Sequence, residues 1–171
     1  MSDLAIRKII ATEAQIQQRV RALTEQISAD YQGKELEVIC LINGASVFCA
    51  DLVRHLKVPA RLHHMAFTSY PQGNTSGEVR VTLDITEPLH NRHVLVVEGI
   101  VISGRTPKYV LDTLTLRQPA SLAMCALGLK PAQLSVELPL KYVAFELGAG
   151  IAVGYGVGWG LEKTLPYLVE M

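Results

Sequence analysis

The residues best suited to chemistry follow an apolar run near the middle of the chain. That run, from His93 to Val97, is followed by Glu98. A short turn comes next and contains Ser103, Gly104, Arg105 and Thr106. Successive backbone N–H groups of such a turn can point at one oxyanion, and the helix expected after it adds the positive end of its dipole. The hydroxyl groups of the turn can donate as well. The pattern is typical of a phosphate-binding turn.

A purely structural explanation of these residues stays open. Gly104 would let the strand turn into the helix, and Thr106 would cap that helix. Glu98 would form a salt bridge with a nearby Arg or Lys, since a carboxylate at the end of an apolar strand needs a partner if it is buried. The turn alone is a weak motif.

The elements that would position these residues alternate between strands and helices. Apolar residues recur with helical spacing from Ile6 to about Tyr31, and Gly33 follows as a stop signal. Strands are expected over 36–42, 60–67, 78–83, 93–97, 120–127 and 140–145, with helices over 46–56 and 105–117. This alternation predicts an α/β fold, with a mostly parallel, twisted sheet flanked by helices. We expect one domain over 1–171, including an N-terminal helix within 1–33 and a mobile loop over 69–77.

Composition excludes several classes of function. The 171 residues carry a net charge of zero, so no overall field draws the chain to nucleic acid or to an anionic membrane. We expect a cytoplasmic protein, since the sequence opens with no signal peptide pattern. No metal site is predicted from the residues: His63 and His64 alternate across a strand, and the cysteines read as reduced, buried thiols. The cysteines are Cys40, Cys49 and Cys125.

In an open α/β sheet, ligands bind beyond the carboxyl ends of the strands, where the strand order reverses. The loops after Ile42 and after Val97 are therefore the candidates. Together with their surroundings, these loops resemble, in one collinear order, the hypoxanthine/guanine branch of the purine phosphoribosyltransferases. The resemblance rests on Ile42 to Ala45, Phe48 to Val53, Ser76 to Val79, Glu98 to Thr106, Lys130 with Pro131, Tyr142 to Phe145, Gly154 to Gly156 and Leu165 to Tyr167.

The resemblance implies a type I phosphoribosyltransferase fold and a Mg²⁺-dependent transfer of phosphoribose from phosphoribosyl pyrophosphate to a purine. It implies that Asn43 and Gly44 form the pyrophosphate loop and that Ser69 and Tyr70 belong to the mobile loop. In the purine site it implies that Lys130 bonds the exocyclic oxygen, Tyr142 stacks on the base and Val143 offers its carbonyl. The assembly it implies is a homodimer or homotetramer.

The chain departs from the family pattern at its acids. Glu98 remains, but Gly99 stands in place of the second acid, Ile102 in place of the catalytic aspartate and Ala149 in place of a metal-binding aspartate, while Asn43 replaces a lysine. Lost carboxylates weaken both Mg²⁺ binding and the stabilisation of a cationic transition state. A lost general base costs about a hundredfold to ten-thousandfold in rate.

Three hypotheses follow. The leading one is a homologue with a degenerate site that binds a purine nucleotide or phosphorylated ribose, has weak or no transfer activity and serves a regulatory or assembly role, with no cofactor. The second is an active purine-salvage enzyme that uses Mg²⁺, in which Glu98, with Glu146 or Asp84, replaces the missing acids. The third is an interaction protein that binds no ligand.

Overall fold

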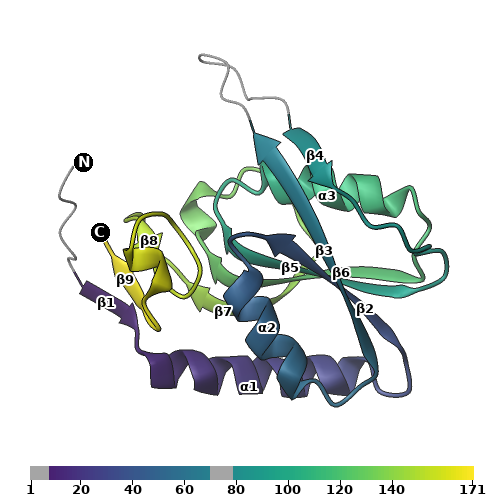
Figure 1. The fold of residues 1–171 in the computed structure, drawn as a ribbon, viewed down its shortest axis with the longest axis horizontal. Coiled ribbons are helices and arrows are strands. Elements are labelled where there is room, and N and C mark those ends of the chain that lie inside the picture. The colour runs from purple at the N-terminus through teal and green to yellow at the C-terminus, as the bar shows by residue number, and fades with distance from the viewer. Residues whose placement is uncertain (1–7, 70–78) are drawn as a thin grey trace.

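A six-stranded sheet with the order β4-β3-β2-β5-β6-β7 forms the centre of the fold (Figure 1). The structure is a computed structural model that describes residues 8–69 and 79–171. Its strands in this sheet are β2 (Leu36–Ile42), β3 (Ala60–Ser69), β4 (Val79–Leu83), β5 (His93–Val101), β6 (Ser121–Leu129) and β7 (Leu140–Glu146). All neighbours are parallel except β4, which is antiparallel to β3. The predicted fold class is confirmed.

Helices cover both faces of this sheet. The helices α1 (Glu13–Asp30) and α2 (Ser46–His55) pack on one face, where their apolar side chains join those of β2, β5 and β6. The helix α3 (Arg105–Thr115) packs on the other face through Val110, Leu111 and Leu114. Burial of the sheet on both sides explains why its strands read as nearly continuous apolar runs.

The prediction of a helix from the start of the chain was wrong over its first residues. Lys8–Ala11 form a strand, β1, and α1 begins only after Thr12. Thr12 caps α1: its hydroxyl accepts from the amide of Gln15 at 3.3 Å, and the Gln15 side chain accepts from the amide of Thr12 at 2.9 Å. This reciprocal capping box marks a helix start that apolar spacing alone does not locate.

A second, smaller sheet joins the two ends of the chain. It has the order β1-β9-β8, in which β8 (Ala152–Val153) and β1 both pair antiparallel with β9 (Leu168–Glu170). Short 3₁₀ helices occupy η1 (Pro131–Gln133) and η2 (Glu162–Thr164). Figure 1 shows this sheet beside the start of α1, next to the labelled C-terminus. The glycine-rich segment from Gly148 to Gly160 contributes one of these strands, β8.

The strand order reverses between β2 and β5. From β2 the chain crosses through α2 to β3 on one side, and from β5 it crosses through α3 to β6 on the other. Parallel strands place their carboxyl ends at one edge, so the loop after Ile42 and the turn after Val101 meet there. The predicted mobile loop, including Tyr70, lies outside the described residues, although Ser69 is the last residue of β3. Among the described helices, none is long and apolar enough to span a membrane.

Candidate active site

A cleft with two lobes opens at this edge of the sheet. The α3 lobe, of about 340 Å³, is lined by the start of α3 and by Phe67. The Trp159 lobe, of about 460 Å³, is lined by Gly44, Lys130 and residues of the C-terminal segment, among them Trp159. Three residues of β5 and the turn after it line both lobes and join them: Glu98, Ile100 and Ile102.

The α3 lobe contains most of the predicted phosphate-binding turn. Ser103, Gly104 and Thr106 line it, whereas Arg105 is exposed and is not among the lining residues. Gly104 has a φ of 79° and directly precedes the first residue of α3, with no side chain capping the helix. Thr106 lies inside the first turn, so its predicted capping role is wrong. The first amides of a helix have no partner within it, so this lobe is suited to an anion.

The turn is held in place by a neighbouring segment. The carbonyl of Ser103 accepts two hydrogen bonds at 3.0 Å, from the amide and from the hydroxyl of Ser135. The amide of Arg105 lies 3.5 Å from the Ser103 hydroxyl, so that contact is weak. The amide of Lys108 closes the first helical bond to the Gly104 carbonyl at 2.9 Å. The peptide groups facing the lobe are therefore positioned before any ligand binds.

Glu98 is the one carboxylate among the described residues that line either lobe. Its Oε1 accepts from the amide of Gly99 at 2.7 Å. Burial raises the pKa of the Glu98 carboxyl to about 7, and the hydrogen bond from Gly99 opposes that shift. No Lys, Arg or His side chain in the described part of the chain forms a salt bridge with it. A raised carboxyl pKa in a cleft is a mark of functional sites.

Close approach of the backbone explains the glycine at position 99. A Cβ atom placed on Gly99 would lie 2.7 Å from the carbonyl oxygen of Gly44 and 2.9 Å from its carbonyl carbon. Any side chain here would have to displace the loop after β2. The second acid of the family pattern is therefore excluded by packing as well as by the sequence.

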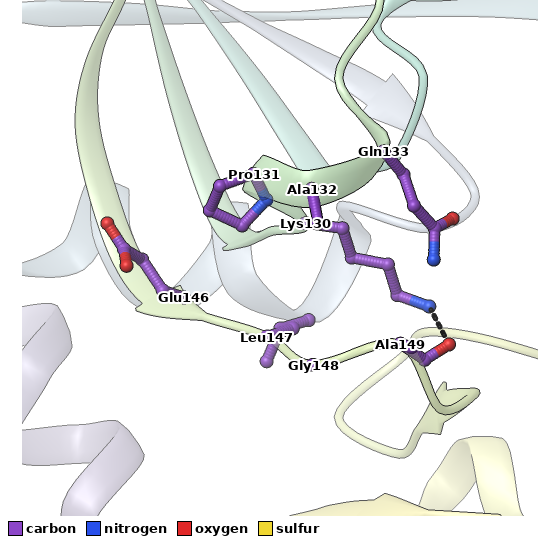
Figure 2. Close-up of a pocket in the computed structure, with 8 residues that line it drawn as sticks. All are labelled: Lys130, Pro131, Ala132, Gln133, Glu146, Leu147, Gly148 and Ala149. Carbon is purple, nitrogen blue, oxygen red and sulfur yellow. Dashed lines mark hydrogen bonds between the residues drawn. The ribbon is translucent and has the colours of Figure 1, made fainter.

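The two other positions that lack the acid of the family pattern are Ile102, which lies in the cleft, and Ala149, which lies outside it. Ile102 lines both lobes with 46% of its surface exposed, so it presents an apolar side chain to the cleft. Ala149 lies outside both lobes, in a third pocket of about 300 Å³. Figure 2 shows this pocket, in which Lys130 extends toward Ala149 while Glu146 lies on the opposite side.

Lys130 is buried and lies between the Trp159 lobe and the third pocket. Its Nζ donates to the carbonyl of Gly150 at 2.7 Å and, more weakly, to that of Ala149 at 3.4 Å. An ammonium group has three donors, so one remains for a ligand carbonyl. The structure thus brings Lys130 to the cleft, as predicted.

The structure does not bring the predicted base-stacking residues to the cleft. Tyr142 is buried on the α1 face of the sheet, and its hydroxyl donates to Asp30 at 2.7 Å. The carbonyl of Val143 accepts from Arg19 at 2.9 Å. Stacking by Tyr142 and the offer of the Val143 carbonyl were therefore wrong. In their place Ile151, Ala152, Val157, Gly158 and Trp159 line the lobe.

Sequence reasoning missed this wall, although the chain contains one signal for it. Trp159 is the single tryptophan of the chain and stands between two glycines. It is 57% exposed, and Ile151 is 39% exposed. A large aromatic side chain on a tight, exposed segment is typical of a contact surface for a flat ligand.

The remaining polar candidates, Asn43, Asp84 and Glu146, are not among the residues that line either lobe. Asn43, in the loop between β2 and α2, is exposed, and its carbonyl accepts from the amide of Ser46 at 3.3 Å, while Gly44 lines the Trp159 lobe. Asp84 is paired with Arg117 at 2.6 Å, and the exposed Glu146 lines the third pocket. Neither carboxylate lines the cleft.

The cleft offers few ligands for a divalent cation. Among the described residues, no group of three or more His, Cys, Asp or Glu side chains could hold a metal ion. Mg²⁺ is commonly held by one or two carboxylates together with substrate phosphates. Glu98 fits that minimal arrangement, in which the substrate would bring most of the oxygen ligands. His63, by contrast, lies 2.7 Å from Glu37 and has a structural contact. The cysteines are free and buried, as predicted: Cys40, Cys49 and Cys125.

Proteins of one family resemble this chain in both sequence and fold. Residues 7–158 match the phosphoribosyl transferase domain family. The chain is 37% identical to hypoxanthine phosphoribosyltransferase of Haemophilus influenzae, over 94% of this chain and 92% of the relative. It is 36% identical to hypoxanthine-guanine phosphoribosyltransferase of Dictyostelium discoideum, over 96% and 95%.

Solved structures agree with these relatives. A crystal structure of a hypoxanthine-guanine phosphoribosyltransferase from Bacillus anthracis superposes with a TM-score of 0.92 at 33% identity, covering 98% of this chain and 99% of that one. A hypoxanthine phosphoribosyltransferase from Staphylococcus aureus gives 0.92 at 30% identity, covering 97% and 91%. The chain therefore belongs to the phosphoribosyltransferase family, and its relatives are of the hypoxanthine and guanine type.

Proposed function

We propose that the chain acts in purine salvage and transfers phosphoribose from phosphoribosyl pyrophosphate to hypoxanthine or guanine. The observation that carries this proposal is the position of Glu98, between the anion-binding turn of α3 and the lobe that contains Lys130 and Trp159. The relatives align over nearly the whole chain, and their names support the same activity.

Each part of the cleft has a role in this reaction. The amides and hydroxyls of the α3 turn hold the phosphate of the sugar, and Glu98 accepts from the ribose hydroxyls. Lys130 donates to the exocyclic oxygen of the purine, and Trp159 lies against the base. A purine nitrogen then forms a bond to the ribose carbon as the bond to pyrophosphate breaks. When bound, Mg²⁺ supplies charge neutralisation for the pyrophosphate.

The proton released by the purine must go to water or to the leaving pyrophosphate, since Ile102 cannot accept it. Absence of a general base commonly lowers a rate by about a hundredfold to ten-thousandfold. We therefore expect turnover to be slow and to depend strongly on Glu98.

A second function is nucleotide binding without transfer. Two observations favour it: Gly99 packs against Gly44 with no room for an acid, and Ile102 faces the cleft. In this case the turn and Lys130 would still hold a nucleoside monophosphate, and the role would be regulatory or in assembly.

One assay separates the two functions. Formation of inosine or guanosine monophosphate is measured with Mg²⁺, phosphoribosyl pyrophosphate and the free base. Purine salvage predicts turnover that Glu98→Gln abolishes and that Glu146→Gln, a surface carboxylate outside the cleft, leaves unchanged. Absence of turnover, with thermal stabilisation by inosine monophosphate, would establish binding alone. If neither turnover nor stabilisation is observed, both functions are rejected and an interaction protein is favoured.

We also expect a homodimer or homotetramer in the cytoplasm. The apolar composition, with 49% hydrophobic residues, is compatible with a sizeable interface between subunits. Sedimentation equilibrium measures the state directly. A monomer at all accessible concentrations would contradict this part of the proposal.

A further inference from the structure

One residue of the C-terminal segment, close in sequence to the residues that line the Trp159 lobe, has an unusual backbone. Tyr155 has a φ of 50°, a left-handed value that is uncommon for residues other than glycine. It occupies the tip of a tight turn in which the amides of Gly154 and Val157 each donate to the carbonyl of the other, at 3.1 and 2.9 Å. Asn and Gly favour such left-handed turn positions. A tyrosine here therefore calls for a compensating contact.

The side chain of Tyr155 supplies that contact. It is buried, with 5% of its surface exposed, and its hydroxyl donates to Oδ2 of Asp51 on α2. The same oxygen accepts from the side chain of Gln17 on α1 at 2.9 Å. Arg54 lies 3.6 Å from the other carboxylate oxygen but is largely exposed. Asp51 therefore joins α1, α2 and the C-terminal segment at one point.

A second contact lies one turn away on the same face of α2. Val47 packs against Gly156, where a Cβ atom would lie 2.9 Å from the Val47 side chain. Positions four residues apart lie on one side of a helix, so Val47 and Asp51 face the turn together. The helix α2 begins two residues after Gly44, which also lines the lobe.

We propose that Asp51 and Tyr155 are positioning residues that latch the turn before Val157–Trp159 against α2 and so fix where this segment and Gly44, which all line the Trp159 lobe, lie relative to one another. Main-chain bonds also hold the turn: the amides of Tyr155 and Gly156 donate to the carbonyls of Leu165 and Lys163, at 2.8 and 2.9 Å. Those partners belong to the C-terminal segment itself. The latch, in contrast, joins the wall to the layer of helices that carries the loop after β2.

The strained backbone supports this role. Residues held in sparsely populated backbone regions persist where the surroundings fix them, and they cluster at ligand sites. Without the hydroxyl contact, Tyr155 would retain the strain and lose the interaction that offsets it. The turn would then be free to relax, and Val157, Gly158 and Trp159 would move with it.

The single tryptophan gives a readout that needs neither ligand nor turnover. Tyr155→Phe removes the hydroxyl and keeps the ring, and Gln17→Met removes the other hydrogen bond to the same oxygen of Asp51 while leaving the wall in contact. Trp159 fluorescence is excited at wavelengths that tyrosine does not absorb, and quenching by acrylamide is measured well below the unfolding temperature of each variant.

The latch predicts that Tyr155→Phe raises the quenching constant of Trp159 and shifts its emission to the red, while Gln17→Met leaves both at the wild-type values. Asp51→Asn, which retains an acceptor for the hydroxyl, should give a smaller change than Asp51→Leu. Wild-type quenching in Tyr155→Phe, or an equal rise in Gln17→Met, would overturn the proposal. Because no substrate is present, failure of the proposed enzymatic function leaves this test intact.

Discussion

Replacing Glu98 with Gln should stabilise the protein above neutral pH, although Glu98 is the residue on which the proposed reaction most depends. The pKa of Glu98 is raised by burial from an ordinary value of 4.5 to about 7. Between these pH values the folded state retains a proton that the unfolded state has lost. Wild-type stability therefore falls as the pH rises through this window. The neutral amide of the Glu98→Gln variant has no charge to bury at any pH.

The size of the effect follows from the same shift. The rise of the Glu98 pKa from 4.5 to about 7 corresponds to at most roughly 3 kcal/mol at pH values above the window. For a chain of this length, that is a rise of roughly 6 to 12 °C in Tm. Below about pH 4.5 both states of the wild type are protonated at this position, and the difference should vanish.

Urea denaturation followed by circular dichroism, at about pH 4 and about pH 8, measures this difference. Glu37→Gln is a control for which the expected change in stability has the opposite sign. Burial favours a higher pKa for Glu37, but hydrogen bonds from His63 and Arg61 outweigh burial and lower it. Glu37→Gln should therefore cost stability at neutral pH. If Glu98→Gln is no more stable than the wild type at about pH 8, or equally stabilised at both pH values, the assignment of a partly buried carboxylate with no salt-bridge partner among the described residues fails.

Three further substitutions test the roles assigned to residues of the cleft. Ile102→Asp should raise steady-state nucleotide formation, by up to about a hundredfold to ten-thousandfold, because it places a base in the cleft; an unchanged rate would reject this account of slow turnover. Gly99→Asp should instead lower Tm and not restore activity, because its Cβ would meet the carbonyl of Gly44 at 2.7 Å; wild-type Tm by calorimetry would contradict the packing argument. Tyr142→Phe should cost about 1.5 to 3 kcal/mol in urea unfolding through its lost bond to Asp30, with unchanged affinity for inosine monophosphate in calorimetry. A weaker affinity would return Tyr142 to the purine site.

Apolar patterning predicted most of the central sheet. The strand over 36–42 and the starts of α2 and α3 fall where the spacing placed them, and the two loops at the strand reversal do line the cleft. Such segments are buried on both faces, so their pattern depends little on distant contacts. The end of β5 was placed too early, at Val97 rather than Val101, because Glu98 and Gly99 look like a strand end while both continue the strand.

The base side of the cleft could not be predicted in the same way. Tyr142 was assigned to stacking by the resemblance to the family pattern, but strand alternation points it toward α1. The actual wall comes from a glycine-rich segment with little periodicity. Its path depends on the pairing of its strand β8 with β9 and on contacts such as that between Tyr155 and Asp51, which join residues far apart in the sequence. Local patterns carry little information about such contacts.

The small sheet has a consequence for the order in which the protein folds. Its central strand, β9, pairs with both β1 and β8, and Lys8 lies opposite Glu170. Closing so long a stretch of chain is entropically costly and slow compared with forming neighbouring βα units. The half of the cleft built on β5 and α3 should thus take shape early, and the half that ends in Trp159 should dock last. In refolding experiments, competence to hold a phosphate would then precede competence to hold a base.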